Sequence, residues 1–118
     1  MAIERFEDIK AWQKAQDLAV DVYFIFGKIK DFGFRDQICR AVVSVSSNIA
    51  EGFSRSSNAD FVRFLYIAIA SCNEVRSLLY LAQRLDYLPP ERKDYLTKNA
   101  DEVAKIIKGL IKSMTKKS

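Results

Sequence analysis

From Phe61 to Cys72 the sequence reads FVRFLYIAIASC, and only one of these side chains carries a charge. The run belongs to a segment of helical periodicity that extends to about Asp86. A helix that is apolar on nearly every side is buried on nearly every side. We therefore expect this helix to be covered both by its neighbours in the chain and by something beyond them.

Helical periodicity continues on both sides of this segment and predicts three further helices. Ser57 followed by Asp60 resembles a capping box and sets the start of the apolar helix. Gly27 stands where a left-handed helix cap is expected, and Pro90 suits a first helical position. The additional helices are predicted at about residues 7–26, 34–53 and 90–114.

Each predicted helix carries an apolar stripe with i, i+3, i+4, i+7 spacing, which marks the side facing a core. Short connections between the helices favour antiparallel neighbours. The sequence therefore predicts an all-α fold, a single up-down-up-down four-helix bundle over residues 1–118. The expected core residues outside the central helix are Ile9, Trp12, Ala15, Ala19, Val22, Tyr23, Phe26, Ile38, Ala41, Val42, Val45, Ile49, Phe53, Val103, Ile106, Ile107, Leu110 and Met114.

Composition is that of a soluble globular chain, with 118 residues, 49% of them hydrophobic and 29% charged. The longest uncharged run, residues 64–73, is too short to span a bilayer. The opening residues 1–5 lack a basic segment leading into an apolar one, so they do not resemble a secretory signal. We expect a cytoplasmic protein.

The chain contains no histidine, which excludes Ser-His-Asp, Cys-His and carboxylate-histidine metal chemistry. Its two cysteines, Cys39 and Cys72, are too few for a zinc site and are expected to be buried apolar side chains. No cofactor, metal or catalytic residue is predicted. The remaining enzymatic alternative is a carboxylate-only metal site formed by Glu51 and Glu74.

Positive charge is concentrated in the second half of the chain. The formal net charge is +4, and residues 60–118 supply all of it. At 100° per residue, four lysines of the last helix share a narrow arc, and no acidic residue follows Val103. Such a stripe suits a polyanion, and it equally suits a solvated face at a helix C-terminus. These lysines are Lys105, Lys108, Lys112 and Lys116.

Arginines near the ends of the second predicted helix give a second candidate surface for nucleic acid: Arg35, Arg40 and Arg55. Arginine binds phosphate and carboxylate equally well. Acidic residues are close enough in sequence to pair with them instead, so both interpretations stay open.

Small polar residues on the second and third predicted helices form a third pattern. Buried polar groups are costly unless they are paired. We therefore expect these side chains to hydrogen-bond between the two helices or across a subunit boundary. They are Ser44, Asn48, Glu51, Ser71 and Glu74.

The outer side of the apolar helix is the expected oligomer interface. A four-helix bundle covers only one side of each helix, and the simplest cover for the other side is a second copy of the chain. The expected interface residues are Phe64, Tyr66, Ile67 and Ile69.

The second predicted helix also carries a family resemblance. The stretch from Phe34 to Gly52, FRDQICRAVVSVSSNIAEG, resembles the signature of bacterial four-helix-bundle proteins encoded in intervening sequences of 23S rRNA genes, also called S23 ribosomal proteins. The opening FEDIKAWQKA, from Phe6, is similar to the first helix of that family, and the resemblance extends over about residues 5–112.

The resemblance implies a non-enzymatic bundle that assembles into a ring, typically a pentamer. A related accessory protein of diversity-generating retroelements shares the fold, has a basic surface and binds nucleic acid. We therefore expect a homo-oligomer that binds RNA or DNA through a basic surface. The alternative is a protein-binding scaffold or accessory factor that does not bind nucleic acid.

Overall fold

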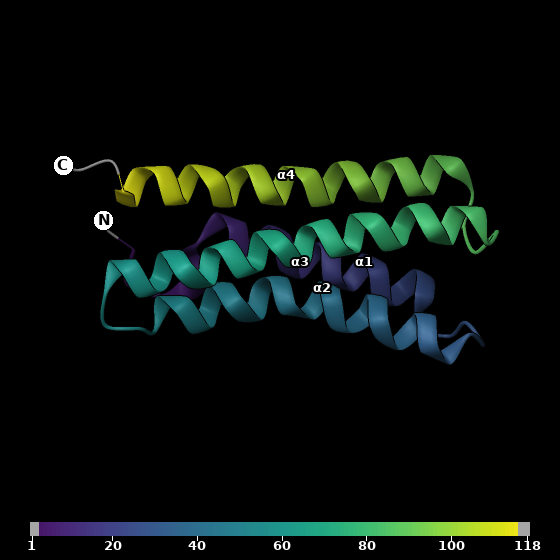
Figure 1. Ribbon diagram of the computed structural model, residues 1–118, viewed down its shortest axis with the longest axis horizontal. Coiled ribbons are helices and arrows are strands. Elements are labelled where there is room, and N and C mark those ends of the chain that lie inside the picture. The colour runs from purple at the N-terminus through teal and green to yellow at the C-terminus, as the bar shows by residue number, and fades with distance from the viewer. Residues whose placement is uncertain (1–2, 116–118) are drawn as a thin grey trace.

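Four long helices and one short helical turn form the computed structural model, which describes residues 3–115 (Figure 1). Within this range there is no strand, so the all-α prediction is confirmed. The elements are η1 (Phe6–Asp8), α1 (Lys10–Phe26), α2 (Phe32–Phe53), α3 (Asn58–Arg84) and α4 (Pro90–Thr115).

The helices form an elongated bundle measuring 48 × 21 × 19 Å. Figure 1 shows successive helices running in opposite directions, with both ends of the chain at the same end of the bundle. Each of α1 and α3 packs against both α2 and α4, whereas in residues 3–115 α1 does not pack against α3. The helices α1 and α3 therefore occupy diagonal corners, and their outer faces point to different sides of the bundle.

Polar side chains fix the starts of two helices. Asp31 caps α2, because its Oδ1 accepts a hydrogen bond from the Phe34 amide at 3.2 Å. Its Oδ2 accepts a second one at 2.6 Å from the Tyr87 hydroxyl, which ties the α1–α2 loop to the α3–α4 loop. Ser57 caps α3 by accepting from the Asp60 amide at 3.1 Å, as the sequence predicted.

Three helix boundaries differ from the prediction by two residues or more, and the first is the start of α1, at Lys10 and not at about residue 7. Gly27 has φ −61°, so α1 does not end in the expected left-handed cap. The left-handed residue is Asp86 instead, with φ 61°, just beyond α3. Aspartate tolerates this conformation better than most residues because its short polar side chain bonds locally. The helix α3 consequently ends at Arg84, and α2 begins at Phe32, two residues earlier than predicted.

The core runs the length of the bundle and contains most of the predicted apolar residues. The prediction that Tyr23 belongs to the core is wrong, since Tyr23 is 50% exposed. Leu18, which was not predicted, is part of the core of α1. Both cysteines are buried and unbridged, as expected. Burial raises the pKa of the Cys72 thiol to about 12, so that thiol stays protonated at neutral pH.

By length and composition alone, α3 is apolar enough to cross a membrane. Half of its most apolar window is buried inside the bundle, where it packs against α2 and α4. Its composition therefore matches that of the central helix of a bundle.

Candidate interaction surfaces

The outer face of α3 carries exposed apolar side chains. Tyr66 is 59% exposed and Ile67 is 39% exposed. Ile69, in contrast, is partly buried and packs against the core. Of the four residues expected at an interface, Tyr66 and Ile67 are thus the exposed ones.

Phe64 is half-buried and lies between two arginines. The guanidinium carbons of Arg55 and Arg63 each lie 4.7 Å from the centroid of its ring. Both arginines also have nearby acidic partners, at 2.8 Å from Arg55, just beyond α2, to Glu51 and at 3.0 Å from Arg63 to Asp60 within α3. Arg55 is therefore part of a local ion-pair and cation–π arrangement. Because its guanidinium is already engaged, it is less available to bind a phosphate.

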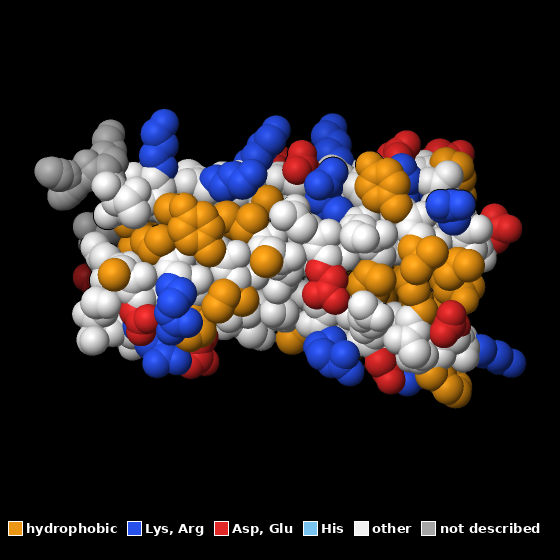
Figure 2. Space-filling model, viewed as in Figure 1, with side chains coloured by type: hydrophobic (Ala, Val, Ile, Leu, Met, Phe, Trp, Pro, Cys, Tyr) orange, Lys and Arg blue, Asp and Glu red, His pale blue; other side chains and the backbone are white. Residues whose placement is uncertain are grey.

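The apolar face of α3 continues toward the other end of the bundle. Tyr80, Leu81 and Leu85 are each about half-exposed. Figure 2 shows hydrophobic side chains in two groups along the middle of this side of the molecule. A surface of this length, with few charges between the groups, is typical of a face that packs against another protein chain.

A second apolar face, on α1, was missed from the sequence. Phe24 is 84% exposed, and Val20 and Tyr23 are 66% and 50% exposed. With Gln16 and Ala19 these residues line a shallow depression of about 420 Å³. The signal was available: Val20 and Phe24 form an i, i+4 pair of large apolar residues displaced from the core stripe.

The predicted polar motif connects α2 and α3. The hydroxyl oxygens of Ser44 and Ser71 lie 2.9 Å apart, and Asn48 donates to Ser44 Oγ at 2.9 Å. Gln37 Nε2 lies 3.5 Å from Glu74 Oε2, a longer contact between the same helices. Ser44 and Ser71 therefore bond between the two helices, as the sequence analysis expected. Glu51 departs from it, because its carboxylate pairs with Arg55, which follows the end of α2, and not with a residue of α3.

The other arginines and lysines expected to bind nucleic acid differ in their exposure and in whether an acidic side chain contacts them. Arg35 contacts Asp36 at 2.9 Å and lies 4.6 Å from the centroid of the Phe32 ring. Arg40 is exposed on α2. Lys105, Lys108 and Lys112 are exposed on α4, and Figure 2 shows Lys and Arg side chains projecting along its free edge. Lys116 lies outside the described residues.

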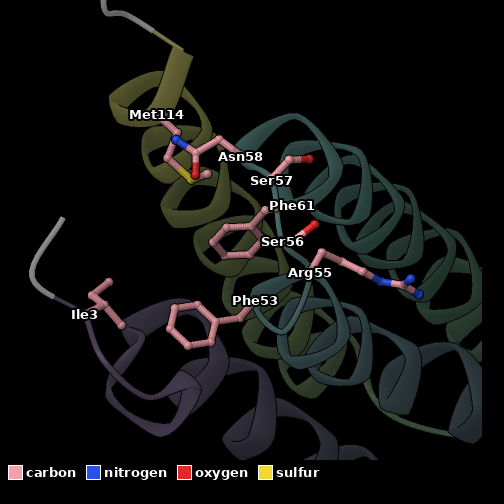
Figure 3. A pocket seen from close by; sticks show the side chains of 8 residues that line it. All are labelled: Ile3, Phe53, Arg55, Ser56, Ser57, Asn58, Phe61 and Met114. Atoms are coloured by element: carbon pink, nitrogen blue, oxygen red, sulfur yellow. The ribbon is translucent and has the colours of Figure 1, made fainter.

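A cavity of about 210 Å³ lies at the turn between α2 and α3 (Figure 3). Ile3, Phe53, Phe61 and Met114 give it an apolar lining, and the remaining lining residues are Arg55, Ser56, Ser57 and Asn58. Figure 3 shows the Arg55 side chain extending away from the cavity. The lining holds no carboxylate, thiol or imidazole, so none of its side chains is suited to act as a general base.

The carboxylate pair considered as a metal site does not gather further ligands. Glu51 is engaged by Arg55, and Glu74 lies beside Gln37. Among residues 3–115, no three side chains of His, Cys, Asp or Glu come together as a metal site would require. The surfaces that remain as functional candidates are the apolar faces of α1 and α3 and the basic end of α4.

Comparison with known proteins identifies relatives of the whole bundle. A family model described as 23S rRNA-intervening sequence protein matches residues 7–109. The chain is also similar to a crystal structure from the S23 ribosomal protein family, a protein of unknown function from Bacteroides thetaiotaomicron. The two are 28% identical with a TM-score of 0.81, covering 86% of this chain and 98% of that one. No curated protein matches the sequence.

Proposed function

Since the chain belongs to the 23S rRNA-intervening sequence protein family, we propose that it is a non-enzymatic, cytoplasmic homo-oligomer that binds RNA or DNA through a basic surface. The observation that carries this proposal is the pair of exposed apolar faces on α1 and α3. They lie on helices at diagonal corners of the bundle, and α4 presents exposed lysines beside them.

Two different apolar faces support assembly into a ring. A contact between unlike surfaces places each subunit in the same relation to the next, and such contacts close into a ring when the rotation permits. The α1 face of one subunit, with Phe24 and Val20, would pack against the α3 face of its neighbour, with Tyr66 and Ile67. A ring of five, the number that the family resemblance implies, uses every such face.

The lysines of α4 support the nucleic-acid part of the proposal. Lys105, Lys108 and Lys112 are exposed and have no acidic residue after them in the helix. In a ring, this cluster repeats once per subunit. Repeated cationic clusters bind polyanions without reading their sequence, and the binding weakens as salt displaces the protein from phosphates.

The direct test is a fluorescence-anisotropy titration of the protein with labelled RNA and DNA at two salt concentrations. The proposal predicts binding at low salt that weakens strongly between about 50 and 200 mM salt. Absence of binding to both nucleic acids at low salt would contradict the nucleic-acid part of the proposal.

The second candidate is a protein-binding scaffold, and the 84% exposure of Phe24 favours it. In this case an apolar face of the assembly docks a partner protein. An apolar complex survives nuclease treatment and high salt, whereas a phosphate-dependent complex dissociates. Affinity capture under those two conditions therefore separates the candidates, and recovery of no stable partner would count against the scaffold.

A further inference from the structure

Arg76 is a partly buried cation of α3 with an unpaired donor. Its Nε is buried, and no described atom accepts a hydrogen bond from it. Among residues 3–115, no carboxylate forms an ion pair with its guanidinium either. A buried donor without an acceptor is costly, and more so when it belongs to a charged group. A single copy of the chain therefore leaves this charged donor without an acceptor.

Arg76 lies on the side of α3 that faces α4. One turn before it, Cys72 is close enough to Asp101 of α4 for that carboxylate to add to the burial that raises the thiol pKa. One turn after it, the centroid of the Tyr80 ring lies 4.3 Å from Lys93 Nζ of α4. Tyr80 belongs to the exposed apolar face of α3. Arg76 therefore borders that face on its α4 side.

Two carboxylates border the apolar face of α1 on the corresponding side. Asp17 and Asp21 line a groove of about 150 Å³ together with residues of α4, so both lie on the α4 side of α1. Asp17 precedes Val20 by three residues, and Asp21 precedes Phe24 by three. Neither acid forms an ion pair with a described residue, Lys14 of the same groove included. The α1 face thus carries unpaired negative charge where the α3 face carries unpaired positive charge.

Hydrogen bonds through α2 relate positions on α1 to positions on α3. Ser44 of α2 bonds to Ser71 of α3. The helix α2 runs opposite to both of its neighbours, so Ser46, two residues further along it, is level with Ile69 of α3 (Figure 1). Gln16 of α1 donates to Ser46 Oγ at 3.0 Å. Gln16 and Ile69 therefore lie at about the same height along the bundle.

The two unpaired charges lie at matching heights. Five residues further along both helices, Asp21 is level with Glu74. Arg76 follows Glu74 by two residues, and helix side chains lean toward the N-terminus, which brings its guanidinium to the level of Asp21. Glu74 itself lies on the α2 side of α3, beside Gln37. In a ring whose axis runs along the helices, rotation keeps every atom at constant height, so level residues of adjoining faces meet.

We propose that Arg76 of one copy pairs with Asp21 of the next copy, with Asp17 as the flanking carboxylate. This inference rests on the proposed assembly and names the contact that aligns its subunits. Because α1 and α3 occupy diagonal corners, the α4 side of one face meets the α4 side of the other when both bundles point the same way.

The ion pair supplies alignment, and burial of the apolar faces supplies most of the affinity. Phe24 and Val20 then lie between the two apolar groups of the α3 face. Charge favours a second copy as the occupant of this face, because both partners of the pair stand on one chain, on matching sides and at matching heights. A contact of this kind also gives the buried Arg76 Nε an acceptor.

The test is a charge-reversal cycle on the full-length protein, read as solution mass by light scattering over a range of concentrations. The variants are Arg76→Glu, Asp21→Arg and the double variant. Arg40→Glu, on the exposed surface of α2, is the control for the change of charge. Asp21→Asn, Arg76→Gln and their double repeat the cycle with neutral side chains of similar size, in case a reversal prevents folding. Circular dichroism checks the helix content of each variant.

Each reversal alone is expected to raise the dissociation constant of the assembly at least about tenfold, because it places like charges together. The double reversal restores the pair at every contact and should return the constant to within about threefold of the wild type. In the neutral cycle, the double variant should lose no more than either single variant. Arg40→Glu should stay within about twofold of the wild type.

Recovery in the double variant has one source. Within residues 3–115 of one subunit, α1 does not pack against α3, so Asp21 and Arg76 couple only across a contact between copies. If the wild type assembles and the single variants match it, or the double variants do not recover, the contact lies elsewhere and the proposed assembly stands. If the wild type is a monomer at every concentration, the proposed assembly fails first and this contact fails with it.

Discussion

The hydroxyl oxygens of Ser44 and Ser71 lie 2.9 Å apart, and they link α2 to α3 at a point where both helices are otherwise packed through apolar side chains. Ser71 is 8% exposed, so its hydroxyl has little access to water. Polar pairs buried in this way stabilise one alignment of two helices, because any shift along the helix axis leaves both groups unpaired.

The serine pair is expected to act as a unit. Ser44→Ala and Ser71→Ala should each lower the free energy of unfolding by about 1 kcal/mol, since each removes one partner from a half-buried hydrogen bond. The double variant should cost less than the two singles together, by about 0.5 kcal/mol or more. Urea unfolding of the four proteins measures this coupling, and strictly additive losses would show that the hydroxyls do not interact.

Gly52 in α2 and Gly109 in α4 should respond to alanine in opposite directions. Gly52→Ala places a Cβ 2.6 Å from the Phe64 Cβ and 2.9 Å from Phe61 Cδ1, so α2 and α3 must separate. Such overpacking costs about 1–3 kcal/mol. Gly109→Ala should instead stabilise the protein by up to about 1 kcal/mol, because the position is exposed. Urea denaturation compares the two, and a shift of the same sign in both variants would refute this description of their surroundings.

Cys72 should resist alkylation in the folded protein. Burial raises its pKa from the ordinary 9.0 to about 12, and only the thiolate attacks an electrophilic thiol reagent. A maleimide or iodoacetamide probe near neutral pH should therefore label Cys72 only after unfolding, as mass spectrometry would show. Labelling of native Cys72 as fast as in the denatured chain would contradict its burial.

The same shift gives a pH dependence of stability with a definite sign. Because the folded thiol holds its proton above the pH at which the unfolded thiol loses it, the unfolded state binds fewer protons. The contribution of Cys72 is therefore fully present below about pH 9 and is lost as the pH rises toward about 12. Cys72→Ala should show a shallower alkaline decline than the wild type in urea unfolding. An identical slope would refute this.

The two apolar faces should complement each other between variants. Phe24→Glu removes the α1 face and Ile67→Glu removes the α3 face, and both positions are exposed enough for the bundle to fold. Each variant alone should be monomeric by light scattering and retain its helical circular dichroism. A mixture should form a heterodimer, because each variant keeps the face that the other lacks. If each variant alone instead forms a dimer, each face pairs with its own kind, and the contact between α1 and α3 is refuted.

Much of the fold was predictable from the sequence because helix signals are local. Apolar spacing, the Ser57 cap and the Pro90 start depend on residues within one or two turns of each other. Tyr23 and the α1 cap were misassigned for a different reason. Both depend on how far α1 is rotated against α2 and α4, which the spacing along one helix does not determine.

The candidate surfaces could be predicted only where the exposure of a side chain depends on residues close to it in the sequence. The exposure of Tyr66 and Ile67 follows from the apolar circumference of α3, whereas Ile69, on the same run, turns toward the core. The sequence left open whether Arg55 binds phosphate or pairs with an acidic residue, and in the structure it pairs with Glu51 and stacks on Phe64 of α3. Contacts between helices settle such cases, and they depend on the packing of the whole bundle.

The solution mass of the wild-type protein tests the central claim most directly, because the proposed assembly depends on the uncovered faces of α1 and α3. Light scattering coupled to size-exclusion chromatography should give a multiple of the 13.5 kDa chain, about 68 kDa for five copies. The mass should persist at high salt, since the contact is apolar. A mass of 13.5 kDa at every concentration and salt would contradict the account.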